Sequence, residues 1–126
     1  MKKILIVIAD YYEDISSTLL KSAKGNLNNF SIKVIRVPGV FEIPVTISKN
    51  IKKYDAFIAL GCVIKGETPH FDFISSASTL AIMNLSVDFK KPIGNGIITC
   101  LNMKQAKARG KKGKEAAKAV ISVLSQ

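Results

Sequence analysis

Two apolar runs constrain the fold of this chain most. Residues 3–9 read KILIVIA and residues 55–64 read DAFIALGCVI, each with a charged residue only at its start. Continuous runs of this kind, rich in β-branched residues, indicate strands that are covered on both faces. Strands buried in this way are typical of parallel sheets, so we expect helices on both sides of a parallel sheet.

The rest of the chain alternates between strand and helix patterns. Further strands are expected at 31–37, which alternates in hydropathy, and at 97–101. Apolar residues recur at helical spacing in 13–27, from about Ile43 to 54, and in 72–89, 103–109 and 112–126. Residues 90–96, KKPIGNG, are expected to form a turn or loop. This order predicts one domain over residues 1–126, an α/β three-layer sandwich with right-handed crossovers.

The charge of the chain raises nucleic-acid binding as a function. The formal net charge is +10, and the basic residues are 17 lysines and only two arginines, Arg36 and Arg109. Base recognition favours arginine, and stacking needs exposed aromatic residues, so we expect no nucleic-acid partner. One dense basic cluster, residues 104–118, is explained either by a solvated helix face or by an anion site.

Neither the apolar runs nor the cysteines indicate export or a membrane. The run at 3–9 is shorter than the ~18 residues that span a bilayer, and no signal-peptide cleavage site follows it. Cys62 and Cys100 are too few for a disulfide scaffold, and with a single histidine they make no convincing zinc site. We therefore expect a cytoplasmic protein with two buried, reduced thiols.

The loops that follow the predicted strands are the expected place for a ligand, because parallel sheets bind ligands at the carboxyl ends of their strands. One of these loops contains His70, the only histidine of the chain. Histidine transfers protons near neutral pH. Glu67 and Thr68 stand near a helix start, where backbone amides can hold an anion. A residue that merely begins a helix explains His70 equally well, so residue types alone leave its role open.

Common catalytic motifs are absent. Gly61 and Gly66 have the separation of a P-loop, but Glu67 stands where the lysine should follow. The GNG at 94–96 lacks a third glycine and precedes a strand, which excludes a dinucleotide fingerprint. No GxSxG is present, so a serine hydrolase has no support.

Three segments resemble those of the lumazine synthases, the 6,7-dimethyl-8-ribityllumazine synthase family. They are VPGVFEIP (37–44), ALGCVIKGETPHFDF (59–73) and KGKEAA (112–117), in order over nearly the whole chain. The resemblance implies a flavodoxin-like fold, with a four-stranded parallel sheet flanked by helices. It implies condensation of 5-amino-6-(D-ribitylamino)uracil with 3,4-dihydroxy-2-butanone 4-phosphate in riboflavin biosynthesis, without a metal or cofactor. It also implies homopentamers with active sites between subunits.

The resemblance implies roles for the residues that would handle protons and phosphate. His70 falls on the proton-transfer histidine of the family, and Glu67 and Thr68 fall on its phosphate-binding turn. Arg109 falls on an arginine that reaches the phosphate from a neighbouring subunit. Lys112, in the KGKEAA segment, would assist it.

The resemblance also implies the contacts to the organic part of the substrate. Tyr11 falls on an aromatic residue that stacks on the ring. The remaining positions are Val40, Phe41 and Glu42 for the ribityl chain and Cys62, Val63 and Ile64 for the pyrimidine, mostly through the backbone.

This chain departs from the family pattern at three places. Residues 10–12 read DYY where Arg-Phe-Asn is common, and Asn95 stands where many members have a phenylalanine beside the substrate. The loop from Arg109 to Lys112 is also shorter than usual. These departures leave two alternatives, a lumazine- or flavin-binding protein without turnover and a riboflavin synthase of archaeal type.

Overall fold

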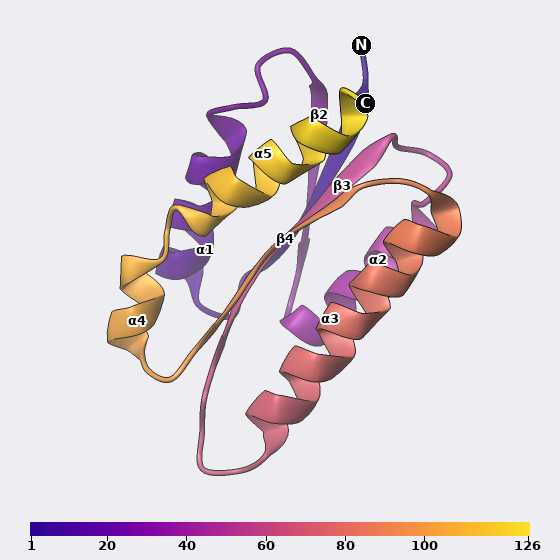
Figure 1. Cartoon of the computed structure of the whole chain (residues 1–126). Coiled ribbons are helices and arrows are strands. Elements are labelled where there is room, and N and C mark those ends of the chain that lie inside the picture. The colour runs from indigo at the N-terminus through magenta and orange to yellow at the C-terminus, as the bar shows by residue number, and fades with distance from the viewer.

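A computed structural model describes the whole chain, residues 1–126, as helices packed on both faces of a four-stranded sheet (Figure 1). The strands are β1 (Lys3–Ala9), β2 (Ser31–Val37), β3 (Ala56–Ile64) and β4 (Ile93–Cys100). The helices are α1 (Glu13–Lys24), the 3-10 helix η1 (Val40–Glu42), α2 (Ile43–Lys49), α3 (His70–Phe89), α4 (Met103–Ala108) and α5 (Lys112–Leu124). All strand pairs are parallel, in the order β2-β1-β3-β4. The predicted α/β architecture is confirmed, and the order is that of flavodoxin-like folds.

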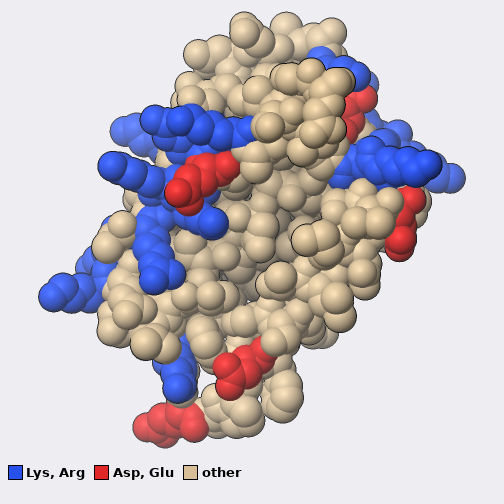
Figure 2. Space-filling model, in the orientation of Figure 1, with Lys and Arg blue, Asp and Glu red and all other residues tan.

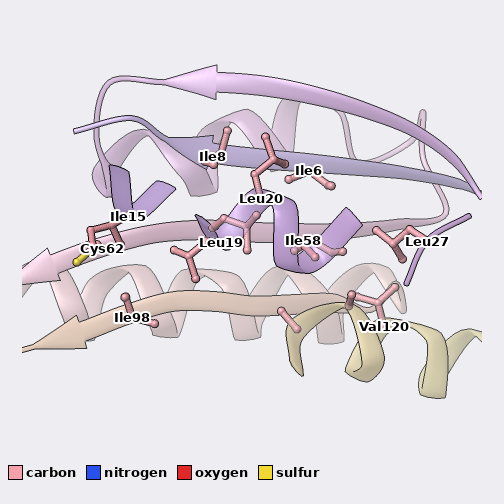
Figure 3. Packing of buried hydrophobic residues seen from close by; sticks show 14 of the residues in the cluster. Ile6, Ile8, Ile15, Leu19, Leu20, Leu27, Ile58, Cys62, Ile98 and Val120 are labelled. Atoms are coloured by element: carbon pink, nitrogen blue, oxygen red, sulfur yellow. The ribbon is translucent and has the colours of Figure 1, made fainter. Parts of the chain in front are cut away.

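Helices α1 and α5 cover one face of the sheet, and they close a core there within the chain. Leu19 and Leu20 of α1 pack with Ile6 and Ile8 of β1 and with Ile58 of β3 (Figure 3). Complete burial of a side chain of this size stabilises the fold by roughly 1.5–3 kcal/mol. The apolar spacing that predicts α1 in the sequence therefore corresponds to its sheet-facing side.

Helices α2 and α3 cover the other face. Ile43 and Ile47 of α2 are fully buried against Leu5 of β1 and Phe57 of β3. The long α3 contributes less, because Ile82 is its only buried apolar side chain. Much of α3 therefore has no partner within the chain.

The predicted turn at 90–96 is wrong in its second half, because β4 already begins at Ile93. Gly94 lies inside the strand and is buried. A β-carbon at that position would clash with the backbone carbonyl of Ala116, since α5 packs directly over this strand. The glycine thus marks a close approach of helix and strand, a role that glycine also plays in strand interiors.

Helix α3 begins at His70, two residues earlier than predicted. Pro69 precedes it, with a φ of −70° that suits the entry to a helix. At its other end the helix stops at Lys90, which adopts the left-handed conformation with φ 53°. None of the helices is long and apolar enough to cross a membrane.

Candidate active site

A cavity of about 590 Å³ opens at the carboxyl ends of β1 and β3. These strands are neighbours, and the helices that follow them, α1 and α3, leave toward opposite faces of the sheet. Parallel sheets bind ligands at such a switch point. The lining residues, mostly apolar or aromatic, are Tyr11, Tyr12, Gly39, Val40, Phe41, Glu42, Cys62, Val63, Ile64, His70, Phe73 and Ile74.

The turn between β1 and α1 presents an aromatic wall. The backbone N–H of Asp10 donates to the carbonyl of Val37 at 3.0 Å, and Arg36 Nη1 donates to Asp10 Oδ1 at the same distance. These bonds fix the start of the turn to the end of β2. Tyr11 is left 76% exposed, with its ring 4.9 Å from that of Tyr12 and at 77° to it. An exposed ring at a cavity mouth is suited to contact a planar ligand.

The segment after β2 forms the second wall. Val40 is buried, and a β-carbon at Gly61 would lie only 2.9 Å from Val40 Cγ2. The absence of a side chain at Gly61 therefore lets η1 sit close to β3. This packing turns Phe41 outward, where it is 68% exposed, and leaves Glu42 half-buried. An apolar ring and a carboxylate acceptor thus stand side by side in the cavity.

The end of β3 forms the floor. Pairing with β1 runs from Ile4–Ala56 to Ile8–Leu60 and then stops, whereas pairing with β4 continues to Ile64 and Cys100. The overhang, residues 61–64, therefore has a strand on one side only. Peptide groups that point to its open side have no strand to pair with, and backbone donors and acceptors seek partners when covered. A ligand in the cavity can supply those partners.

Cys62 is part of this floor, and its thiol is not a nucleophile. Burial, followed by the neighbouring Cys100, raises the pKa of Cys62 to about 12. A thiol with such a pKa is protonated near neutral pH, and the thiolate is the reactive form. No three His, Cys, Asp or Glu side chains lie close enough together to hold a metal ion.

His70 lies at the mouth of the cavity, exposed, as the first residue of α3. Its backbone N–H donates to Thr68 Oγ1 at 3.4 Å, which ties the preceding loop to the helix start. Glu67 and Thr68 are exposed in that loop, and neither lines the cavity. His70 therefore lies next to both the cavity and the predicted anion turn.

Besides Glu67 and Thr68, three more predicted site residues lie outside the cavity of this chain. Arg109 is exposed at the end of α4, and its Nη1 lies 3.5 Å from the carbonyl of Thr99. Lys112 begins α5 and pairs with Glu115 at 3.6 Å. Asn95 lies in β4, five residues before the strand ends, which is roughly 16 Å along the strand. None of the three lines the cavity formed by its own chain.

Comparison with known proteins identifies the family. The family model described as 6,7-dimethyl-8-ribityllumazine synthase matches residues 1–126. The chain belongs to this family. It is 44% identical to the 6,7-dimethyl-8-ribityllumazine synthase 1 of Rhodopseudomonas palustris, over 97% of this chain and 83% of that protein. It is 42% identical to the Agrobacterium fabrum protein named 6,7-dimethyl-8-ribityllumazine synthase, over 96% of this chain and 91% of that protein.

Four residues of this lumazine synthase-family cavity were missed by the reasoning from sequence: Tyr12, Gly39, Phe73 and Ile74. Phe73 and Ile74 follow His70 by three and four positions, so they share its face of α3. A prediction that α3 begins at His70 would have placed both residues at the cavity. Burial, then the neighbouring Tyr11 and Cys62, raises the pKa of Tyr12. Its hydroxyl therefore stays protonated and can donate a hydrogen bond.

Proposed function

We propose that this chain condenses 5-amino-6-(D-ribitylamino)uracil with 3,4-dihydroxy-2-butanone 4-phosphate to 6,7-dimethyl-8-ribityllumazine. The reaction releases phosphate and water and belongs to riboflavin biosynthesis. One observation carries the proposal. The overhang of β3, the η1 segment and His70 meet around one cavity in a chain that the family model matches from end to end.

The uracil ring fits the part of the cavity between Tyr11 and the overhang. An aromatic side chain offers a stacking surface, and open peptide groups offer donors and acceptors to the edge of a pyrimidine. The ribityl chain then runs along Val40, Phe41 and Glu42. The Glu42 carboxylate accepts hydrogen bonds from its hydroxyls.

The reaction is a condensation in which each bond-forming or bond-breaking step is accompanied by a proton transfer. The substrate amine attacks the ketone and an imine forms with loss of water. Phosphate then leaves, and the ring closes with loss of a second water. Each step moves a proton, and an imidazole accepts and returns protons near neutral pH. His70 is the one histidine, and it lies at the cavity, so we assign the transfer to it.

The phosphate group requires a second copy of the chain. Glu67 and Thr68 supply an exposed turn beside His70, yet Arg109 and Lys112 do not reach the cavity of their own chain. A neighbouring copy that presents Arg109 and Lys112 would add two positive charges next to the turn. Asn95 would enter the site from the neighbour in the same way.

An apolar stripe on α3 supports self-association. Phe73 is 68%, Leu80 62%, Met83 58% and Val87 65% exposed. Their spacings of seven, three and four residues are those of a helix face that packs on another helix. We assign this stripe to a second copy of the chain, because the active site also needs one, and we propose the homopentamer that the resemblance implies.

We also propose that residues 1–126 form a single lumazine synthase domain and that the protein is cytoplasmic. Cys62 and Cys100 are both buried and form no disulfide. Reduced thiols of this kind are typical of proteins in reducing compartments.

The test is an assay with both substrates and with each alone. We expect phosphate release and appearance of the lumazine, well above the uncatalysed rate, only when both substrates are present. Turnover of lumazine alone would identify a riboflavin synthase instead. Tight lumazine binding without turnover of either kind would identify a binding protein and contradict the proposal.

A further inference from the structure

The edge of the sheet opposite the active site holds a second cavity, of about 780 Å³, at the amino ends of β1 and β2. The polar lining residues of this cavity, which we call the lysine pocket, are Lys3, Ser31, Lys33, Lys52, Lys53 and Tyr54. It lies one strand length from the active site, roughly 20 Å for a strand of seven residues. It is therefore separate from the proposed phosphate turn.

Strand register brings two of these lysines together. Lys3 aligns with Ser31, and Leu5 aligns with Lys33. Side chains alternate along a strand, so Lys3, Leu5 and Lys33 point to one face of the sheet. That face is the one α2 covers, because Leu5 belongs to its core. Lys3 and Lys33 thus lie on the same face of the sheet as Leu5, at its amino-terminal edge.

No carboxylate forms an ion pair with a lysine of the lysine pocket. The two ion pairs of the chain lie elsewhere. Asp55 is the nearest acid in the sequence, and its Oδ2 accepts a hydrogen bond from the backbone N–H of Lys3 at 2.8 Å. All four lysines are exposed and none of their ammonium groups forms an ion pair. Four like charges around one cavity repel each other, and an anion would remove that repulsion.

Ordinary roles for lysine explain only part of this arrangement. Lys52 and Lys53 follow the end of α2, where the helix dipole favours cations. Lys3 and Lys33 come from strands, which have only small dipoles. At the same edge, Lys91 Nζ donates to the carbonyl of Ile51 at 2.6 Å and so has a structural partner. Basic side chains also gather beside α4 and α5 (Figure 2). The cavities beside α1, α4 and α5 are lined by at most two lysines each.

We infer that the lysine pocket binds a small oligophosphate anion, either inorganic or the phosphate tail of a nucleotide. Four lysines line this concave surface together with Ser31 and Tyr54, and such a positively charged lining fits a compact, multiply charged ligand. Single-stranded nucleic acid needs free aromatic faces along a groove. The only aromatic residue here, Tyr54, packs its ring on Phe57 at 6.0 Å.

Calorimetric titration of the full-length, assembled protein with inorganic triphosphate tests this inference at about 0.15 M salt, where exposed charges are screened beyond about 8 Å. We expect Lys52→Gln/Lys53→Gln to weaken binding at least roughly tenfold. The matched control, Lys114→Gln/Lys118→Gln, removes the same charge from exposed positions of α5 and should weaken it less than about twofold. An equal loss in both variants, or no binding of triphosphate, would overturn the inference.

A second measurement locates the ligand. Triphosphate should protect the four pocket lysines from acetylation, as read by mass spectrometry, while Lys114 and Lys118 stay reactive. Protection only near Arg109 would place the ligand at the active site and overturn the inference. An RNA oligonucleotide that binds more tightly than triphosphate, equally in both variants, would show an unspecific basic surface and overturn it as well.

Two further arms complete the design. Equal affinity for ATP and triphosphate would identify the phosphates as the recognised group. Tighter binding of ATP would identify a nucleotide as the ligand. Either result supports an oligophosphate site in the lysine pocket. The Lys52→Gln/Lys53→Gln variant should keep the lumazine-forming activity unchanged, because neither lysine lines the active-site cavity. Failure of the lysine pocket is thereby distinguishable from failure of the proposed function.

Discussion

The α1–α5 layer and the α2–α3 layer cover the same sheet, but they bury very different shares of their helices. Helix α1 buries five of its 12 residues, whereas α3 buries two of its 20, Ser78 and Ile82. The first layer is completed within one chain. The second layer leaves apolar side chains exposed and also carries His70, Phe73 and η1 around the cavity. The chain thus closes one layer by itself and leaves the other open for the ligand and the second copy that we propose.

The largest effect on stability should come from breaking the closed layer. A β-carbon at Gly113 would clash with the carbonyl of Leu19, where α5 crosses α1. Gly113→Ala should therefore lower the free energy of unfolding by about 3 kcal/mol, the upper range for overpacking. Gly25→Ala is the matched control, because the added β-carbon would lie 3.7 Å from its nearest neighbour, Ser22 O. Denaturant titration measures both, and equal losses would refute the difference between the two sites.

Removal of the imidazole should affect turnover without affecting stability. We expect His70→Ala to slow lumazine formation by roughly 10²–10⁴-fold, the range of general acid–base catalysis. The free energy of unfolding should change by less than about 0.5 kcal/mol, because the side chain is exposed. Ser122→Ala, at an exposed position of α5, is the control. An unchanged rate in His70→Ala would return this residue to a structural role.

A charge on the α3 stripe should open the assembly. Leu80→Glu places a carboxylate where we assign contact with a second copy, and we expect association to weaken by at least roughly tenfold. Activity should fall in parallel as the protein is diluted, because Arg109 then no longer reaches a neighbouring site. Val123→Glu makes the same change at an exposed position of α5. Light scattering gives the particle mass, and an intact particle for Leu80→Glu would contradict the assignment.

The smallest expected effect concerns the pH dependence of stability at Cys62, which lines the cavity and belongs to the core of the closed layer. Its folded-state pKa is raised by burial to about 12 from 9.0, so the folded chain holds this proton more tightly than the unfolded chain. The resulting stability is fully present below pH 9 and is lost as the pH rises toward 12. Between about pH 8 and pH 10 the wild type should lose roughly 1 kcal/mol more stability than Cys62→Ala.

Cys100→Ala controls this measurement. Burial is the first cause of the raised pKa of Cys62, and Cys100 adds to it through its charge and a hydrogen bond. Cys100→Ala should therefore reduce the alkaline loss without abolishing it. Identical pH profiles for the wild type and Cys62→Ala, recorded by denaturant titration, would show that this thiol does not titrate as its burial requires.

The sequence predicts the strands well where the hydropathy pattern alone decides them. The bounds of β1 and β2 are those expected from their hydropathy patterns. The start of β4 was not predictable in the same way, because Gly94 is a turn residue by local preference and becomes a strand residue through its contact with α5. The start of α3 was placed two residues late, because Pro69 and His70 carry no apolar periodicity.

The candidate site could be predicted as far as strand ends determine it. The loops after β1, β2 and β3 do converge, because parallel strands share one carboxyl edge. Phe73 was not predicted as a site residue, because its position at the cavity depends on where α3 begins. The places that we propose for Arg109 and Asn95 depend on a second chain, and no pattern within one sequence specifies the geometry between two copies.

The overhang of β3 also bears on how this protein can tolerate change. If peptide groups of residues 61–64 recognise the ring, the recognition pattern does not depend on which side chains those residues carry. Cys62, Val63 and Ile64 can then be exchanged for other apolar residues of similar size while donors and acceptors stay in place. Proline alone would remove a donor. Recognition of the ring through the backbone would then tolerate most single substitutions at the end of β3.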